Sequence, residues 1–200
     1  QAMQTNNVIT PQQARTLHGL FLERVARSPD KVAYRYFRQD AWRELTWREA
    51  HSQVARWQSA LVKQGLQRGD RVAIMMRNCP QWVMFDQAAM SLGLVVVPLY
   101  IVDRPDNIAF IVNNADIKVL LLETAEQWQS LCTVGDQLAN VKCFVSIDNV
   151  PDSGDARLHS MSDFLPDTAQ FQPAPPCEMG ELASIIYTSG TTGKPKGVML

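Results

Sequence analysis

Cysteine and histidine are scarce in this 200-residue chain, and neither occurs in the spacing of a metal site. The four cysteines, which are Cys79, Cys132, Cys143 and Cys177, form no C-x-x-C pair. The three histidines are well separated along the sequence from the cysteines and from one another, so no zinc-ligand spacing occurs. We therefore expect four reduced thiols in a cytoplasmic protein. A surplus of basic charge is also missing, because the net charge is −1. This balance argues against nucleic acid as a partner.

Long apolar runs are absent as well. The most apolar stretch, 88–102, contains Ser91, Gly93 and Pro98, and it falls short of the roughly 18 residues that a membrane span needs. We expect no transmembrane segment. Hydrophobic residues still make up 46% of the chain, which is enough for a real core and excludes a disordered chain.

The chain does not open with a leader pattern, since its first residues are polar and uncharged. Gln1 and Ala2 resemble a cloning remnant ahead of an initiating Met3. We interpret 1–15 as this remnant and an N-terminal extension, and expect the folded domain to occupy 16–200.

What the chain does contain is an alternation of short apolar runs with amphipathic helix patterns. An α/β fold is predicted, with a mostly parallel, doubly wound sheet and helices on both of its faces. The runs predicted to be strands are 72–76, 95–97, 118–122, 142–147 and 183–187. Between the last two, 148–181 has turn-forming and proline-rich composition and is predicted to be a long connection.

Helix starts are marked by local signals. Thr46 with Glu49 and Thr124 with Gln127 form capping-box patterns, and Thr16 can cap a helix that begins at residue 17. Two further helices are predicted at positions where a polar residue precedes a proline, from Asn78-Cys79-Pro80 to Gly93 and from Asp103-Arg104-Pro105 to Asn114. The helix after Thr124 is expected to reach about Leu138. Alternating residues from Val32, with a turn at Gln39-Asp40, predict an N-terminal β-hairpin.

The most informative segment is Tyr187-Thr188-Ser189-Gly190-Thr191-Thr192-Gly193-Lys194-Pro195-Lys196-Gly197, directly after the last predicted strand. Its glycines allow backbone N–H groups to approach a ligand closely. Its hydroxyls can donate to anionic oxygens, and its lysines supply positive charge. The segment is therefore a candidate phosphate-binding loop; the alternative is a glycine-rich surface turn with solvated lysines.

This loop is not a Walker phosphate loop. That pattern requires glycine five residues before the Gly-Lys pair and a hydroxyl directly after the lysine. Here Thr188 and Pro195 occupy those two positions. No G-x-G-x-x-G follows the first predicted strand either, which argues against a dinucleotide-binding fold.

The segment from Thr188 to Gly197 resembles the AMP-binding signature of the adenylate-forming superfamily, which includes acyl-CoA synthetases, luciferases and the adenylation domains of peptide synthetases. Upstream segments fit as well, and within the superfamily they look most like bacterial long-chain fatty-acid CoA ligases. These segments are Leu45-Thr46-Trp47-Arg48-Glu49, Gly69-Asp70-Arg71-Val72-Ala73, Asn78-Cys79-Pro80-Gln81-Trp82 and Val97-Pro98-Leu99-Tyr100. Such enzymes activate a fatty acid or another carboxylic acid with ATP and Mg²⁺ to give an acyl adenylate, then pass the acyl group to coenzyme A.

The resemblance implies roles for residues of the loop. The triphosphate of ATP would be held by Thr188, Ser189, Gly190, Thr191, Thr192, Gly193, Lys194 and Lys196. Lys196 would act catalytically by stabilising phosphate charge, and Thr188 would lie nearest the magnesium ion. We expect the loop to be more exposed than the strand before it, in which Ile185 and Ile186 should be buried. The residues after the loop should lack supporting partners.

Family members continue for several hundred residues past this signature, so the chain is interpreted as the N-terminal part of an AMP-binding domain, inactive by itself. The alternatives are an acyl-AMP ligase that delivers to a carrier protein and a non-catalytic nucleotide-binding module. The acyl chain length and the oligomeric state are left open by the sequence. The resemblance also leaves room for peripheral membrane contact by the full enzyme.

Overall fold

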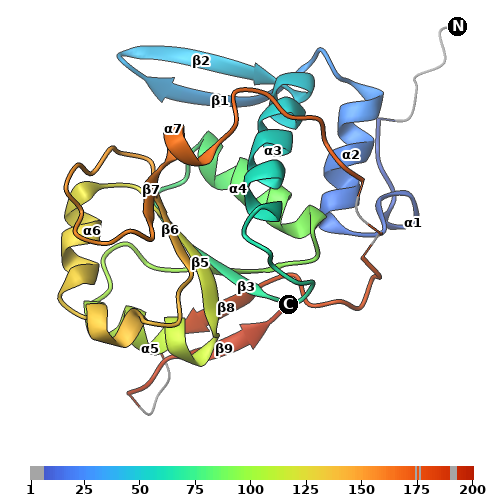
Figure 1. The fold of residues 1–200 in the computed structure, drawn as a ribbon. Helices are drawn as coiled ribbons and strands as arrows, with labels where there is room; N and C mark the ends of the chain where they lie inside the picture. Colours follow the sequence, from blue (N-terminus) through green and yellow to red (C-terminus); the bar gives the residue numbers. More distant parts are fainter. Residues whose placement is uncertain (1–6, 174, 176, 190–192) are drawn as a thin grey trace, which may run out of the picture.

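The central sheet is built from five parallel strands in the order β4-β3-β5-β6-β7 (Figure 1). The computed structural model describes residues 7–173, 175, 177–189 and 193–200. The strands are β3 (Arg71–Met75), β4 (Val95–Pro98), β5 (Ile117–Leu122), β6 (Cys143–Ser146) and β7 (Leu158–Ser160). The first of them, β3, has later strands on both sides, so the chain reverses its direction across the sheet there. The predicted doubly wound sheet is confirmed.

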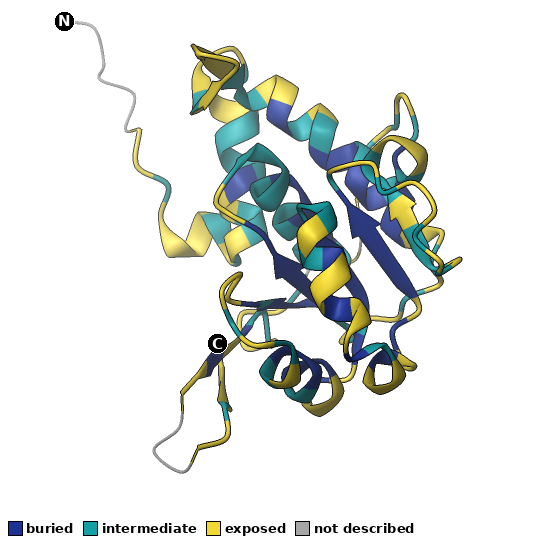
Figure 2. Ribbon diagram, turned by 90° about the vertical axis from the view of Figure 1, so that its left-hand side faces the viewer, coloured by how far each residue is buried: buried dark blue, intermediate teal, exposed yellow. Residues whose placement is uncertain are grey.

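Helices cover both faces of this sheet because alternate strand residues point to opposite sides. Val72 and Ile74 belong to one hydrophobic core and Ala73 and Met75 to the other, and the sheet lies buried between the two helical layers (Figure 2). The first core includes residues from α2 (Leu17–Arg27), α3 (Trp47–Val62) and α4 (Pro80–Ser91). The second includes residues from α5 (Pro105–Asn114), α6 (Ala125–Cys132) and the 3₁₀-helix η1 (Gly135–Leu138). No helix within the described part of the chain is long and apolar enough to cross a membrane.

The helix starts follow the predicted caps with two exceptions, at α4 and α5; the N-cap of α5 is Arg104, not Asp103, and its side chain makes no capping hydrogen bond. Thr16 caps α2, and Thr46 and Thr124 form complete capping boxes at α3 and α6. Cys79, not Asn78, is the N-cap of α4, and its side chain makes no capping hydrogen bond. The helix that was expected to reach Leu138 ends at Cys132, and a separate 3₁₀ turn follows.

The predicted N-terminal hairpin consists of β1 (Val32–Arg38) and β2 (Ala41–Thr46), which pair antiparallel along the upper edge of Figure 1. Its turn residues Gln39 and Asp40 both have positive φ, 51° and 56°. That conformation is typical of a type I′ turn, whose twist matches that of the flanking strands. A short helix, α1 (Pro11–Ala14), precedes α2.

Two sequence predictions need correction in the last quarter of the chain. The connection 148–181 is not structureless, because it contains β7, the edge strand of the sheet, and α7 (Met161–Phe164). Among the described residues, the predicted strand 183–187 pairs with the parallel sheet through a single isolated bridge, between Val96 and Ser184. Beyond that bridge it continues as β8 (Ile185–Thr188), which pairs antiparallel with β9 (Lys196–Met199). Residues 196–199 therefore have a partner, contrary to expectation, because β8 supplies one locally.

Asp86 of α4 is half-buried, and its side chain has no hydrogen bond or ion pair among the described residues. Burial raises the pKa of Asp86 to about 6. In the unfolded chain the same carboxyl group ionises near pH 4. Between pH 4 and pH 6 the unfolded chain therefore loses this proton more readily than the folded chain, and the free energy of unfolding falls as the pH rises. Above pH 6 the loss of stability is constant. We expect Asp86→Asn to raise the free energy of unfolding by roughly 1–2 kcal/mol at pH 7.5 and to have little effect at pH 4. Urea denaturation at the two pH values tests this, and an equal effect at both would contradict it.

Candidate functional site

The predicted phosphate-binding loop connects β8 and β9, whose hairpin extends from the lower edge of the molecule (Figures 1 and 2). Thr188 is the last residue of β8, and Lys196 is the first residue of β9. Ser189, Gly193 and Lys194 lie between them and are exposed. The other predicted loop residues lie outside the described residues: Gly190, Thr191 and Thr192.

Pairing of the two strands places Thr188 directly opposite Lys196. Side chains at opposed positions of an antiparallel pair lie on the same face, about 4.5–5.5 Å apart at Cβ. Both residues are exposed, and neither side chain has a hydrogen bond or ion pair within the described part of the chain. A hydroxyl donor and an ammonium group are thus available side by side at the point where the loop begins and ends. Both groups can donate hydrogen bonds to an anionic oxygen.

The opposite face of β8 is fixed to the domain. Ile185 and Tyr187 are buried in the core that contains α5. The Tyr187 hydroxyl donates a hydrogen bond of 2.5 Å to Oδ1 of Asn114 at the end of α5. Burial raises the pKa of Tyr187, so the phenol stays protonated as this donor. Ile186, expected to be buried, points the other way and is 38% exposed, because alternate residues of a strand face opposite sides.

Gly197 allows β9 to lie close to β8. It is paired with Tyr187, and a Cβ atom at Gly197 would lie 2.8 Å from Ile185 Cγ2 and 3.1 Å from Tyr187 Cζ. Any side chain would therefore push against two residues that anchor the hairpin. The glycine of the Pro195-Lys196-Gly197 segment has a packing role, which composition alone does not reveal.

We expect Gly197→Val to lower the free energy of unfolding by about 1–3 kcal/mol, because the added atoms overpack a buried contact. Gly180→Val is the matched control, since a Cβ at Gly180 has nothing within 4 Å and its φ is not in the left-handed region. Chemical denaturation of both variants measures the difference. Equal losses would show that the contact with Ile185 and Tyr187 carries no cost.

The two lysines of the loop have different surroundings. The Lys194 ammonium group lies 5.8 Å from the centroid of the Phe110 ring of α5, a cation–π contact. Lys196 instead shares the exposed face with Thr188. Gly193 has φ of +82°, a conformation that a side chain would disfavour. Of the two lysines, Lys196 is the one positioned beside the predicted hydroxyl ligand.

A complete metal site is not formed by the described residues alone, because they contain no group of three or more His, Cys, Asp or Glu side chains placed to hold an ion. All four cysteines are free thiols, as predicted. A hydroxyl oxygen is a suitable ligand for Mg²⁺, which usually takes only one or two protein ligands when it is bound together with substrate phosphates. Thr188 fits that limited role.

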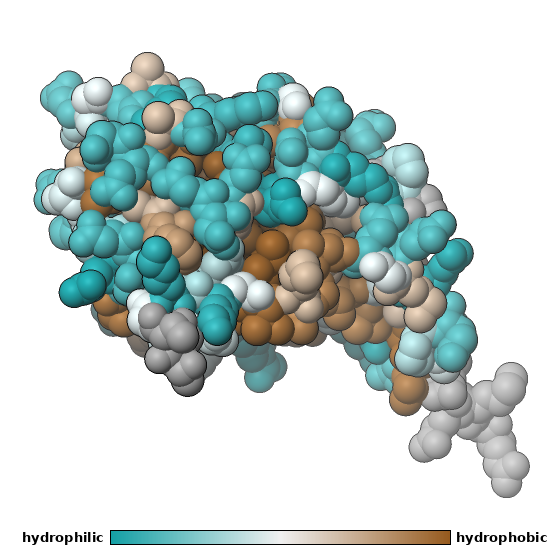
Figure 3. All heavy atoms as spheres, turned by 90° about the horizontal axis from the view of Figure 1, so that it is seen from below, coloured by the Kyte–Doolittle hydropathy of each residue, from teal (hydrophilic) through white to brown (hydrophobic). Residues whose placement is uncertain are grey.

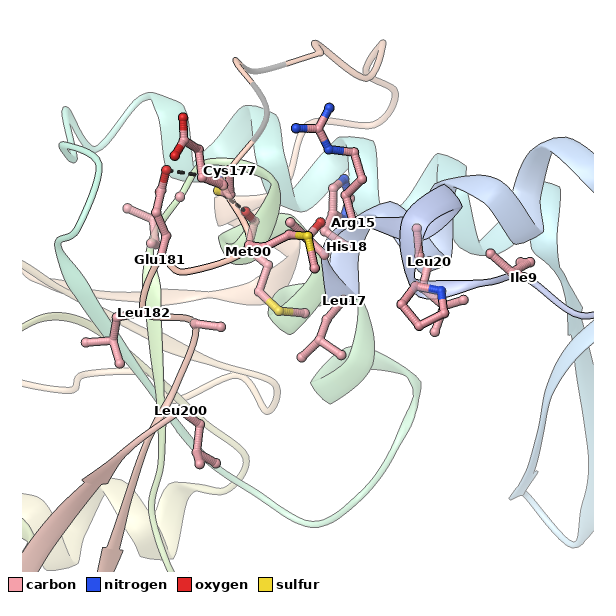
Figure 4. Close-up of a pocket in the computed structure, with 18 residues that line it drawn as sticks. Ile9, Arg15, Leu17, His18, Leu20, Met90, Cys177, Glu181, Leu182 and Leu200 are labelled. Carbon is pink, nitrogen blue, oxygen red and sulfur yellow. Dashed lines mark hydrogen bonds between the residues drawn. The ribbon is translucent and has the colours of Figure 1, made fainter.

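A concave region lies at the base of the β8–β9 hairpin, on the lower side of the molecule where apolar side chains gather (Figure 3). It is a pocket of about 460 Å³. Its walls are mostly apolar, including Leu17, Leu20, Met90, Leu182 and Leu200 (Figure 4). Within it, the Cys177 thiol donates to the Met90 carbonyl oxygen at 3.8 Å. The pocket suits apolar contacts rather than phosphate.

Comparison with known proteins identifies the relatives of this fold. The AMP-binding enzyme family matches residues 21–200. The human long-chain-fatty-acid–CoA ligase ACSBG1 is 27% identical over 196 residues, which are 95% of this chain and 27% of that protein. Fatty acyl-CoA synthetase A of Dictyostelium discoideum is 39% identical over 155 residues, which are 71% of this chain and 22% of that protein.

Solved structures of proteins from the same family have a similar fold. The N-terminal domain of FACL13 from Mycobacterium tuberculosis superimposes with a TM-score of 0.78 and 26% identity, covering 93% of this chain and 44% of that one. The chain thus spans about a quarter of the length of the curated relatives that it matches.

Proposed function

The chain belongs to the AMP-binding enzyme family, and we propose that its residues 16–200 are the N-terminal part of the AMP-binding domain of an ATP-dependent acid–thiol ligase. In the proposed reaction a carboxylate attacks the α-phosphorus of ATP, giving an acyl adenylate and pyrophosphate. The acyl group then passes to the thiol of coenzyme A, and AMP leaves. Mg²⁺ bound together with the nucleotide would neutralise part of the negative charge on the phosphates.

The observation that supports this proposal is the opposed pair Thr188 and Lys196 at the two ends of the glycine-rich loop, whose side chains are exposed and bond no other described residue. In the proposed role, the Lys196 ammonium group binds phosphate oxygens and stabilises charge that shifts toward the leaving pyrophosphate. The Thr188 hydroxyl lies beside the phosphates and magnesium. Ser189 and the loop glycines, with Lys194, would complete the cradle around the triphosphate.

A fatty acid is the proposed carboxylate, because matched relatives are named as long-chain-fatty-acid–CoA ligases and a fatty acyl-CoA synthetase. Coenzyme A is the proposed acceptor for the same reason. Delivery of the acyl group to a carrier protein is the competing reaction in the same family. The described residues contain no feature that favours it.

The full-length gene product tests the proposal. We expect it to catalyse ATP–pyrophosphate exchange that depends on a long-chain fatty acid, and to form acyl-CoA when coenzyme A is added. Exchange without thioester formation, restored by a carrier protein, would replace coenzyme A with the carrier as acceptor. No exchange with any carboxylic acid would refute the proposed ligase activity and favour a non-catalytic nucleotide-binding module.

The 200-residue chain by itself is expected to show no exchange above background. It contains the candidate triphosphate loop but only about a quarter of the length of its matched relatives, and adenylate formation needs both reactants held in line. The same exchange assay, with the full-length protein as positive control, measures this. Robust exchange by the short chain would show that residues 1–200 already contain a complete site.

A further inference from the structure

Residues 166–173, which we call the strap, follow α7 and form neither a helix nor a strand. The strap runs from α7 past α3 to α2 (Figure 1). It leads to the segment 177–183, most of which lines the apolar pocket described above, and then to β8. The position of the strap therefore affects both the wall of this pocket and the chain that enters the β8–β9 hairpin.

Hydrogen bonds tie both ends of the strap to α3. At one end, Arg56 Nε donates to the Pro166 carbonyl oxygen at 2.8 Å. At the other end, Gln58 Nε2 donates to the Gln172 carbonyl oxygen, and the Gln172 N–H donates to Gln58 Oε1, both at 2.8 Å. Between these ends, the backbone of 167–171 has no hydrogen bond with another described residue. The middle of the strap therefore depends on side-chain packing.

Phe171 provides this packing, because its ring contacts the rings of two histidines. Its centroid lies 5.7 Å from that of His18 of α2 and 4.9 Å from that of His51 of α3. Phe21 of α2 stacks on the same two imidazoles at 6.1 and 6.4 Å. Each imidazole thus contacts two phenyl rings, of which the strap supplies one.

The surroundings of His18 favour a neutral imidazole. Its Nδ1 lies 3.0 Å from Gln87 Oε1, which is an acceptor, so Nδ1 carries the proton of the neutral ring. Its Nε2 is buried and has no hydrogen-bond partner among the described residues. A second proton would make Nε2 a buried donor without an acceptor, which is unfavourable. Burial lowers the pKa of His18, the hydrogen bond with Gln87 partly opposes this, and charge on His51 lowers the pKa further.

His51 is subject to the same effect, since burial lowers its pKa as well. A single imidazolium would gain from the face of the Phe171 ring, but two imidazolium groups beside the same ring repel each other. Charged side chains on the surrounding elements make no hydrogen bond or ion pair with either imidazole within the described part of the chain; they include Arg15, Arg48, Arg56, Asp86, Asp167 and Glu178. No neighbouring charge therefore compensates for protonation of the two rings.

We propose that His18, His51 and Phe171 keep the strap packed against α2 and α3 while both imidazoles are neutral, and that the strap is released when they become charged. In the released state the imidazoles regain contact with water and titrate near their ordinary pKa of about 6.5. Below that pH the released state binds protons more readily than the packed state, so acidification favours release. At neutral pH and above, the strap stays packed. This device does not depend on the proposed function.

Amide hydrogen exchange of the 200-residue chain, followed by NMR, tests the proposal. The Gln172 N–H is the reporter, because it is bonded to Gln58 only while the strap is in place. After correction for the intrinsic pH dependence of exchange, its protection factor should fall about 5- to 100-fold from pH 7.5 to 5.5, since each histidine contributes at most about tenfold. Amides of β5 should stay far more protected than Gln172 at both pH values.

His18→Phe combined with His51→Phe removes the titration but keeps two rings beside Phe171. In this double variant the protection of Gln172 should be the same at pH 7.5 and 5.5. His159→Phe is the matched control, because the described structure shows no contact of the His159 ring with Phe171 or with the other two histidines. It should respond to pH as the wild type does.

Three results would overturn the proposal. One is equal protection of Gln172 at pH 7.5 and 5.5 in the wild type. Another is an unchanged pH response in the double variant, which would assign the effect to other titratable groups. The third is equal protection of Gln172 and the β5 amides, which would mean unfolding of the whole chain and not release of the strap. If circular dichroism shows that the double variant is unfolded, the two single variants replace it. Each should then have a smaller pH response than the wild type, and an unchanged response in both would contradict the proposal.

Discussion

Replacement of Lys196 by alanine in the full-length protein is expected to slow formation of the acyl adenylate about 100- to 1,000-fold, the usual cost of removing one preorganised group that stabilises transition-state charge. Lys196 is exposed at the neck of the loop and shares a face with Thr188. Its ammonium group is therefore free to meet phosphate charge that moves during the transfer. ATP–pyrophosphate exchange measures the effect, while the affinity for fatty acid should change little.

The control for this variant is Lys194→Ala. The Lys194 ammonium group already lies over the Phe110 ring on the α5 side, so its loss should slow exchange much less. A second control supplies the acyl adenylate directly and follows transfer to coenzyme A, which Lys196→Ala should leave nearly unchanged. An equal decrease in both half-reactions would show that Lys196 supports the fold of the site and not phosphate transfer.

Replacement of Trp57 by alanine should lower the free energy of unfolding by about 3–5 kcal/mol, the range for loss of a large aromatic side chain from a core. Trp57 of α3 is 1% exposed and packs edge-to-face against Phe85 of α4, with ring centroids 5.5 Å apart. It also contacts the Phe164 ring at 6.0 Å. The cavity left behind would therefore separate α3, α4 and α7.

Trp42→Ala provides the matched control, because it makes the same chemical change at a residue that is 71% exposed. Its effect on stability should stay within about 0.5 kcal/mol. Guanidinium denaturation of the two variants and the wild type gives the comparison. If Trp57→Ala and Trp42→Ala were equally stable, the core packing described for α3 would be wrong.

Local signals in the sequence were sufficient for most of the elements. Capping boxes at Thr46 and Thr124 act within three residues of the chain, so the helix starts could be predicted without any tertiary contact. Apolar runs such as 119–122 identify strands buried on both faces, because neither face can tolerate polar side chains. The same locality made the glycine-, hydroxyl- and lysine-rich loop recognisable as a phosphate-binding candidate. Short elements such as β7 and β9 give no comparable pattern over three or four residues.

The arrangement of the sites depended on contacts between residues far apart in the chain. Pairing of Thr188 with Lys196, the anchoring of Tyr187 by Asn114, and the position of Lys194 over Phe110 all require strand pairing or packing that no local pattern encodes. The ion pair between Arg77 and Glu123 likewise forms only because β3 and β5 become neighbours, although 46 residues separate the two side chains in the chain. Composition and spacing thus determined which groups this protein can offer to a ligand. Tertiary structure decided which of them face the same space, because side-chain direction follows from strand register and helix packing, which are properties of the whole fold.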